Sequence, residues 1–461
     1  MTTNPISATR RFDLAGQEAF AALSGDFNPI HVDPVVARRT LFGEPVVHGL
    51  HLVLWALDAR LAAGPLPPLQ NIRAGFKSPV LLGRTATLRW VGETAEILCD
   101  GTLAAEIMLT PGGAGAALPA PAEGPALPAP PPVPLTQDTI GASGGHLAPA
   151  LAPDRLARLF PALADRADPG LVAALLATTR IVGMECPGLH SLFSELDLDI
   201  AGAGATPGGI DWRCSLFHPE LRLTEIELEG AGVSGTLTAF LRPDAVSQLA
   251  AADAADRLQR AGLATGSYAG RHALVVGGSR GLGEAAAKLL AAGGARVTLT
   301  YASGVADAER VAAEIAEAGG CAEILALDAT APPPPLPAGI THAAYFAAPK
   351  IRQGAAGGGF DAALFTAYAA FFVDGFARLA TALPEAALLY PSTTFVETPE
   401  PRFAEYAAAK AAGETLCAYL QAADPARRIS APRLPRLATD QNAAIVGPAL
   451  ADPVPLLIEI L

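Results

Sequence analysis

The residues best suited to chemistry lie near the N-terminus, in the segment Ser24-Gly25-Asp26-Phe27-Asn28-Pro29-Ile30-His31-Val32-Asp33. Asp26 and His31 stand five positions apart, and the intervening proline favours a loop. An acid and an imidazole held together can move a proton to or from water. Gly49 then opens a long apolar segment, so its N–H is expected at the positive end of a helix, facing an oxyanion. Such groups can add water to a polarised double bond or remove it.

Each of these residues also has a structural alternative. Asp26 could cap a helix or turn, and His31 could be a satisfied loop histidine. We favour the chemical interpretation because the whole segment occurs together with the pair His48-Gly49. His48 and Asp33 are expected to be structural, as a helix cap and a turn residue.

The elements around these residues follow from hydrophobic periodicity. Short helices are expected over residues 15–23 and 35–41, and a long buried helix over 48–61. Strand patterns cover residues 72–80, 85–91, 95–100 and 102–110. The first block, residues 1–112, is therefore an α+β domain.

Three separated segments of this block resemble the MaoC-like hydratases: SGDFNPIHVD, then FGEPVVHGL, then FKSPVLLG at residues 76–83. The resemblance implies a hot-dog fold, in which a sheet wraps one long helix, acting on trans-2-enoyl and (R)-3-hydroxyacyl thioesters. It also implies that Asp26 and His31 are the catalytic pair, that Asn28 and Pro29 shape the loop, and that the Gly49 amide binds the thioester oxygen.

Residues 113–149 are rich in Pro, Ala and Gly, and are expected to form an extended linker. Residues 150–243 repeat the order of an apolar run followed by strands, at 212–217, 221–228 and 235–242. The run 171–181 fits either a helix or a buried strand. By analogy with the MaoC-like family, this block is a second, degenerate hot-dog unit, giving a double hot-dog without a second acid/base pair. His190 either faces the acyl channel or, as we favour, is structural.

A helical connector is expected over residues 244–269, followed by a strand–helix–strand pattern over 270–461. A short buried strand, residues 273–276, leads into a glycine turn and then a helix. Such a turn lets a pyrophosphate approach the helix N-terminus, as in a doubly wound Rossmann-type parallel sheet. The residues expected to contact the nucleotide there are Gly277, Ser279, Arg280, Gly281, Leu282 and Gly283.

This third block resembles the short-chain dehydrogenases/reductases, through its G-x-x-x-G-x-G turn and Tyr406-Ala407-Ala408-Ala409-Lys410. The resemblance makes Tyr406 the proton donor or acceptor at the substrate oxygen. Lys410 would lower the pKa of the tyrosine and bind the nicotinamide ribose. Ser392 would hydrogen-bond the substrate oxygen, with Thr393 as second candidate. A surface helix pair is the structural alternative for Tyr406 and Lys410.

The expected cofactor is NADP(H) rather than NAD, because the strand over residues 296–300 ends in Tyr301-Ala302 without an acid and Arg280 stands in the glycine turn. By the same resemblance, Asp328 contacts the adenine and Thr439 the nicotinamide amide. Residues 346–349 and 365–369 depart from the family, since the usual asparagines are missing. We therefore expect cofactor binding with more assurance than turnover.

Length, composition and net charge limit the number of domains and the classes of partner. The chain has 461 residues, 51% of them hydrophobic, which is enough for about three domains. Its net charge of −13 argues against nucleic acids and anionic membranes as partners, although a locally basic site still admits an anionic substrate. The five cysteines are scattered, so we expect no metal site and no disulfide framework. No signal peptide or membrane span is evident, and we expect a cytoplasmic homo-oligomer.

The sequence thus predicts a bifunctional enzyme of acyl-thioester metabolism, with acyl-CoA or an acyl carrier protein bringing the substrate. One part interconverts enoyl and (R)-3-hydroxyacyl thioesters, and the other interconverts 3-hydroxyacyl and 3-oxoacyl forms with NADP(H). Three alternatives stay open: a hydratase with an impaired nucleotide-binding domain, a reductase for an unrelated carbonyl such as a polyketide or sugar, and a non-catalytic acyl-binding protein.

Overall fold

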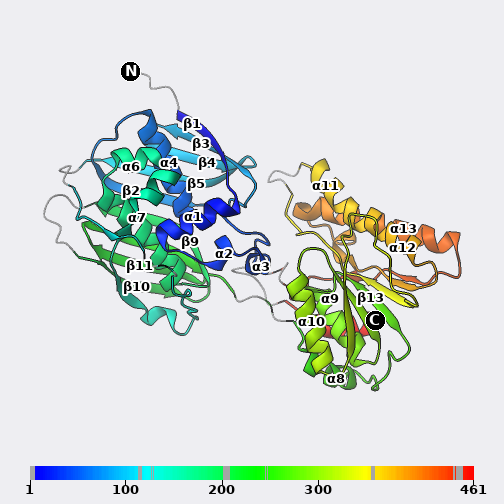
Figure 1. Ribbon diagram of the computed structural model, residues 1–461. Coiled ribbons are helices and arrows are strands. Elements are labelled where there is room, and N and C mark those ends of the chain that lie inside the picture. Colours follow the sequence, from blue (N-terminus) through cyan, green and yellow to red (C-terminus); the bar gives the residue numbers. More distant parts are fainter. Residues whose placement is uncertain are drawn as a thin grey trace. The chain divides into compact units, whose positions relative to one another are not determined.

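The chain divides into two compact units, with the division after residue 245. A computed structural model (Figure 1) describes residues 6–112, 117–125, 127, 129–200, 208–243, 246, 248–354, 359–439, 442 and 450–461.

A ten-stranded antiparallel sheet forms the N-terminal unit, in the order β1-β3-β4-β5-β2-β9-β12-β11-β10-β7. Its strands are β1 (Ile6–Arg11), β2 (Leu69–Phe76), β3 (Thr85–Val91), β4 (Thr94–Cys99), β5 (Thr102–Pro111), β7 (Gly144–Leu147), β9 (Ser191–Ile200), β10 (Ile210–His218), β11 (Leu223–Gly230) and β12 (Val233–Leu241). Alternating residues of most of these strands are buried, so one face of the sheet carries the core and the other faces solvent.

The sheet consists of two halves with the same strand order. In the first half the strands run β1-β3-β4-β5-β2, and in the second β7-β10-β11-β12-β9. Numbered by position in the chain, both halves read 1-3-4-5-2. The two halves join where β2 pairs with β9, with Asn71 opposite Asp199 and Gly75 opposite Glu195.

One long helix belongs to each half, α4 (Gly49–Ala63) to the first and α7 (Pro169–Arg180) to the second. α4 is apolar on nearly every side, which fits a helix buried all round. Trp90 of β3 donates its indole N–H to the carbonyl oxygen of Ala56, which fixes α4 to the sheet. α4 and α7 contact each other and share one core, so the halves form a single packed body (Figure 1).

The shorter helices of this unit surround α4 and α7: α1 (Leu14–Ser24), α2 (Pro29–Val32), α3 (Pro34–Ala37), α5 (Pro153–Leu159) and α6 (Pro161–Arg166). The expected long helix and first-half strands are present with small shifts of their ends, and the run 171–181 is helical. β1 and β9 were not expected from the sequence.

The segment 113–149 is more structured than an extended linker. Its described part contains β6 (Ala122–Glu123), a 3₁₀ turn at Ile140–Ala142 and β7, which pairs with β10 at the edge of the large sheet. Gly144 and Gly145 lie against Trp212 of β10, and a Cβ at Gly145 would meet the indole ring at 3.0 Å. A Gly-rich sequence can thus form an edge strand where only glycine fits, so the second half begins before residue 150.

The C-terminal unit is built on six parallel strands in the order β15-β14-β13-β16-β17-β19, or 3-2-1-4-5-6 by position in the chain. This is the doubly wound, Rossmann-type order. The strands are β13 (His272–Val276), β14 (Arg296–Tyr301), β15 (Cys321–Ala326), β16 (His342–Tyr345), β17 (Ala387–Leu389) and β19 (Ile429–Ser430).

Helices cover both faces of this sheet. One face packs against α8 (Ala251–Arg260), α9 (Gly281–Ala292), α10 (Val305–Glu317) and α14 (Val454–Ile460). The other packs against α11 (Ala362–Ala369), the π-helical turn Ala370–Gly375, α12 (Phe376–Ala382) and α13 (Ala404–Ala423). The expected connector is therefore part of this unit, because Ala254 and Leu258 of α8 are buried in its core.

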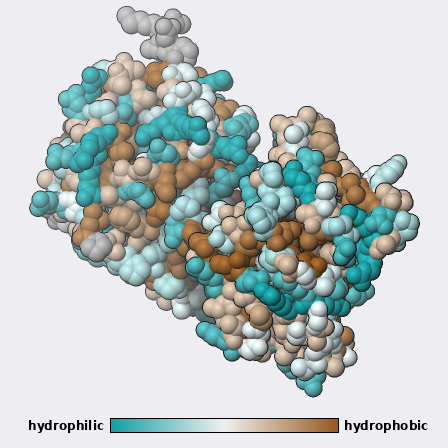
Figure 2. Space-filling model, turned by 45° about the vertical axis from the view of Figure 1, so that its right-hand side comes forward, coloured by the Kyte–Doolittle hydropathy of each residue, from teal (hydrophilic) through white to brown (hydrophobic). Residues whose placement is uncertain are grey.

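Contrary to expectation, one described helical stretch, Ala362–Ala382, is long and apolar enough to cross a membrane by length and composition. Three of its aromatic residues, Tyr368, Phe372 and Phe376, are buried in the C-terminal unit, while most of the stretch is partly or fully exposed. The unit also exposes apolar side chains such as Phe360, and Figure 2 shows hydrophobic residues on its surface.

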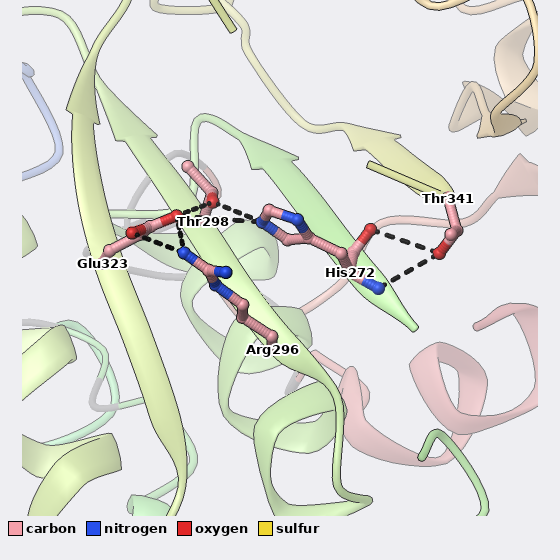
Figure 3. Close-up of polar contacts among 5 residues, drawn as sticks. All are labelled: His272, Arg296, Thr298, Glu323 and Thr341. Atoms are coloured by element: carbon pink, nitrogen blue, oxygen red, sulfur yellow. Dashed lines mark hydrogen bonds and ion pairs between the residues drawn. The ribbon is translucent and has the colours of Figure 1, made fainter. Parts of the chain in front are cut away.

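A polar chain ties three strands of the parallel sheet together (Figure 3). His272 of β13 lies 2.9 Å through Nε2 from Thr298 Oγ1 of β14, and Thr298 donates to Glu323 of β15 at 2.8 Å. Arg296 pairs with the same carboxylate. Because the hydroxyl proton of Thr298 goes to Glu323, its oxygen accepts from His272, and the chain fixes the register of β13, β14 and β15.

Thr298→Val tests this chain. It removes the hydroxyl but keeps the shape, so His272 Nε2 loses its acceptor, at a cost of about 1–3 kcal/mol in the free energy of unfolding. Chemical denaturation of the C-terminal unit measures the loss, and hydrogen exchange of the β13–β15 amides locates it. Thr398→Val, at an exposed position of the same unit, is the control. Equal stability of the Thr298 variant and the wild type would contradict the assignment.

Candidate active site

The segment Ser24–Asp33 forms a loop between α1 and α2. Gly25 ends α1 with a positive φ of 78°, and its N–H donates to the carbonyl oxygen of Ala21. Asn28 then begins α2, its side-chain oxygen accepting from the N–H of Ile30 at 3.2 Å. The loop therefore turns sharply twice, and Asp26 lies between the turns with its side chain buried.

The carboxylate of Asp26 is held by residues from both halves. Oδ1 accepts from the Asn28 N–H at 3.2 Å, and Oδ2 accepts from Thr179 Oγ1 of α7 at 2.7 Å. Gly183 lies directly behind, where a Cβ would come within 2.2 Å of Oδ1. Thr179 and Gly183 were not singled out from the sequence, because neither stands in a motif.

The side chain of Asn28 ties the loop to the second half. Its Nδ2 lies 3.0 Å from the carbonyl oxygen of Gly183, 2.9 Å from that of Gly188 and 3.3 Å from Ser191 Oγ. All three acceptors follow α7 in the chain. An amide NH₂ with several acceptors and no exposure cannot be replaced by an apolar side chain without leaving buried oxygens unsatisfied.

His31 lies on α2 with its ring fixed in one orientation. Its Nδ1 is 2.8 Å from the carbonyl oxygen of Val46, which can only accept, so Nδ1 carries the proton. In the neutral ring Nε2 therefore has a free lone pair and can act as a base. The His31 ring also stacks on His48, with ring centroids 3.9 Å apart.

His48 occupies the N-cap position of α4 without capping it through its side chain. Instead its Nε2 donates to the carbonyl oxygen of Asp26 at 3.0 Å, which fixes the backbone of the Ser24–Asp33 loop. Gly49 is the first residue of α4, so its N–H has no partner within the helix. A Cβ at Gly49 would meet the Phe76 ring at 2.8 Å, so the close contact requires glycine.

Burial shifts the pKa values of Asp26 and His31 in opposite directions. Burial raises the pKa of Asp26, against the opposing effects of His31 and of the hydrogen bonds from Thr179 and Asn28. Burial lowers the pKa of His31, partly offset by Asp26, so the ring is neutral at neutral pH. A carboxyl group and a neutral imidazole whose pKa values approach each other can exchange a proton readily.

Ligand atoms of Asp26, His31 and His48 lie within 4.8 Å of one another, a spacing that a metal ion could bridge. However, His48 Nε2 already donates to a carbonyl oxygen and His31 Nδ1 does the same. Only His31 Nε2 and the Asp26 carboxylate then remain as ligands, fewer than the three or four protein ligands of a zinc site.

A second candidate site lies in the C-terminal unit, at the glycine turn between β13 and α9. Gly277 has a φ of 78°, and its N–H donates to Thr300 Oγ1 at the end of β14. Gly283 lies against the backbone of Gly277, where a Cβ would come within 2.2 Å of the carbonyl oxygen. α9 begins at Gly281 after Arg280, with no side-chain cap on its N–H groups. Uncapped N–H groups behind a glycine turn fit a pyrophosphate, as a dinucleotide cofactor requires.

The other expected nucleotide contacts are placed as follows. Ser279 and Leu282 are half-buried in the turn region, while Asp328 lies exposed just after β15. Asp328 Oδ1 accepts from the N–H and the hydroxyl of Thr330, which lowers the pKa of the carboxyl. Thr439 is buried and follows β19 in the chain.

Ser392 and Thr393 exchange the places that the sequence predicts for them. Ser392 donates its hydroxyl to Glu414, which is held by Arg433, so this hydroxyl proton is already used. Thr393 makes the hydrogen bond to the Tyr406 hydroxyl instead. The second candidate for the substrate-oxygen donor is thus the better placed one.

Lys410 also differs from its expected role. Its ammonium donates to the carbonyl oxygen of Pro391 at 2.6 Å and lies over the rings of Phe372 and Tyr390. Burial lowers the pKa of Lys410 to about 7 and raises the pKa of Tyr406 to about 12. The expectation that Lys410 lowers the pKa of Tyr406 is therefore not met in this arrangement.

Comparison with protein families gives two matches. Residues 3–103 match the MaoC like domain, and residues 271–334 match the short chain dehydrogenase family. The chain joins a MaoC-like domain to a short-chain dehydrogenase domain. Asp26, His31 and Gly49 lie within the MaoC-like match, and the glycine turn and Asp328 lie within the dehydrogenase match.

Parts of the chain are similar in sequence to known proteins. The (R)-specific enoyl-CoA hydratase of Aeromonas caviae is 43% identical over 83 residues, which is 17% of this chain and 60% of that protein. The peroxisomal hydratase-dehydrogenase-epimerase of Saccharomyces cerevisiae is 33% identical over 73 residues, 16% of this chain and 8% of that protein. The chain thus spans less than two thirds of either relative.

Among solved structures, a dehydrogenase/reductase from Sinorhizobium meliloti is 27% identical, with a TM-score of 0.34 over 38% of this chain and 76% of that one.

Asp26→Asn tests the electrostatics of the MaoC-like domain. Because burial raises the pKa of Asp26 above its value in the unfolded chain, the charged carboxylate destabilises the fold at neutral pH. The penalty disappears as the pH falls through the folded and then the unfolded pKa. We expect Asp26→Asn to unfold at higher denaturant than the wild type at neutral pH, with the difference vanishing at about pH 4.

Denaturation curves of both proteins at several pH values check this. Glu18→Gln, which changes an exposed carboxylate on α1, is the control. A variant less stable than the wild type at neutral pH, by an amount independent of pH, would contradict the prediction.

Proposed function

We propose that the chain is a bifunctional acyl-thioester enzyme. Its MaoC-like domain interconverts trans-2-enoyl and (R)-3-hydroxyacyl thioesters, and its dehydrogenase domain interconverts 3-hydroxyacyl and 3-oxoacyl thioesters with NADP(H). The observation that carries the first activity is the free Nε2 of His31, close to the buried Asp26 carboxylate.

The hydration step follows from this geometry. Asp26 orients a water molecule, and His31 Nε2 accepts its proton as the oxygen bonds to C3 of the enoyl thioester. The double-bond electrons move toward the thioester oxygen, where the Gly49 N–H at the start of α4 stabilises the charge. Return of a proton to C2 completes the 3-hydroxyacyl product, and dehydration is the reverse.

We further propose that the N-terminal unit is a double hot-dog in which the second half serves the site of the first. Two observations support this: both halves have the strand order 1-3-4-5-2, and each has one long helix packed in the shared core. Thr179 and the carbonyl groups that bind Asn28 are contributions of the second half to the first.

For the dehydrogenase domain, we propose Tyr406 as proton donor and Thr393 as donor to the substrate oxygen. The glycine turn and the N-terminus of α9 would hold the pyrophosphate of the cofactor, which supplies the hydride when bound. A preference for NADP(H) rests on Arg280 in the turn and on the lack of an acid at Tyr301-Ala302.

The two proposed activities share the 3-hydroxyacyl thioester, so a fused chain would keep this intermediate at high local concentration. The name of the yeast relative combines a hydratase and a dehydrogenase in the same way. The substrate would arrive as an acyl-CoA or on an acyl carrier protein.

A second candidate is an active hydratase whose dehydrogenase domain binds nucleotide without turnover. The contacts of Lys410 with Pro391 and of Ser392 with Glu414 favour it, since neither side chain is in its family role.

Crotonyl-CoA hydration tests the first activity, followed by loss of absorbance of the enoyl thioester. We expect activity in the full chain and a loss of about 10²–10⁴-fold in kcat for Asp26→Asn and for His31→Asn, since the first variant loses the group that orients the water and the second loses the base that accepts its proton. His218→Asn, on the solvent face, should retain full activity. Equal rates in all four proteins would contradict the proposed site.

NADPH oxidation with acetoacetyl-CoA tests the second activity. Thr393→Val should lower kcat by about 100-fold, because it removes the donor to the substrate oxygen. Ser392→Ala, whose hydroxyl faces Glu414, should stay within about threefold of the wild type. The reverse order would restore Ser392 to the role, and a wild type without NADPH oxidation would favour the second candidate.

A further inference from the structure

A polar cavity of about 350 Å³ lies in the second half of the N-terminal unit. Its lining includes Thr136, Gln137, Asp138, His190, Arg222 and Arg242. The two arginines outnumber the single carboxylate, so the cavity is locally basic within an acidic chain.

Backbone pairing places three of these residues at the same end of the sheet. The N–H of Leu241 donates to the carbonyl oxygen of Arg222, and the N–H of Arg242 donates to that of His190. His190 precedes β9, Arg242 follows β12 and Arg222 precedes β11, and these strands are neighbours. The side chains are therefore set by the fold and not by a mobile loop.

Arg222 is held in a strained conformation, with a positive φ of 52° in the turn between β10 and β11. A non-glycine residue there costs about 1 kcal/mol or more, and such strain persists where the surrounding structure fixes it. Its Nε is buried without a hydrogen-bond partner among the described residues. An unpartnered guanidinium N–H on an arginine that lines a polar cavity is suited to an anionic group.

The cavity adjoins the catalytic loop. Arg242 Nη2 donates to the carbonyl oxygen of Leu189 at 2.6 Å, and Asn28 Nδ2 approaches the same oxygen at 3.4 Å. The positive charge of Arg242 also helps to lower the pKa of His31. A thioester with its reacting carbons at His31 thus has an arginine-lined chamber beside it.

We propose that this cavity binds an anionic group of the thioester substrate, with Arg222 as its principal ligand. The inference rests on the proposed hydratase function and assigns a binding role to the half that lacks the acid/base pair. Two sources of the anion share this chemistry: the phosphate of the pantetheine carrier and a carboxylate on the acyl chain.

Steady-state hydration by the full chain and by Arg222→Ala tests the proposal with three substrates. These are crotonyl-CoA, the phosphate-free crotonyl-N-acetylcysteamine thioester, and glutaconyl-CoA, which adds an acyl carboxylate. Arg213→Ala on the solvent face of β10 is the matched control. Loss of a charge-assisted contact should raise KM by about tenfold with little change in kcat.

A rise in KM for crotonyl-CoA but not for the N-acetylcysteamine thioester supports the proposal and identifies the carrier phosphate. A rise confined to glutaconyl-CoA supports it and identifies the acyl carboxylate. Unchanged KM values, or an equal rise for all three substrates, would overturn it while leaving the hydratase intact. A wild type that hydrates none of the substrates would instead refute the proposed function.

Discussion

The N-terminal unit depends on the buried side chain of Asn28. Its NH₂ group binds carbonyl oxygens of Gly183 and Gly188, which belong to the other half of the sheet. Because these oxygens are buried, they need a donor, and Asn28 supplies it from the catalytic loop. The position of Asp26, two residues earlier, is thus set by the second half and not by the loop alone.

The second half therefore contributes a side chain and backbone carbonyl groups to the surroundings of Asp26 and Asn28. Thr179 orients the carboxylate of Asp26, and Gly183 leaves just enough room for it. Arg222 and Arg242, which lie at strand ends of the same half, line a cavity. In the C-terminal unit, by contrast, the glycine turn fits a nucleotide, while Lys410 donates to the carbonyl oxygen of Pro391. The geometry of this unit therefore supports nucleotide binding more directly than catalytic turnover.

The sequence predicted what rests on local chemistry. The loop around Asp26, the helix after Gly49 and the glycine turn at Gly277 carry Pro and Gly at positions that fix the backbone, so their patterns are readable. It could not predict Thr179 or Gly183, because their roles arise from packing between residues about 150 positions apart. The sequence also did not predict β7, because its glycines resemble a linker and the packing of Trp212 on them is not visible in the sequence. It favoured Ser392 over Thr393. Adjacent strand residues point to opposite faces, and spacing alone does not say which face carries Tyr406.

The central claim, that the second half completes the active site of the first, is tested most directly by the pH profile of kcat/KM for enoyl-CoA hydration in Thr179→Val. Thr179 donates to the ionised carboxylate of Asp26 and so lowers its pKa. We expect the acidic limb of the profile to move to higher pH in the variant while KM changes little. A profile superimposable on that of the wild type would contradict it.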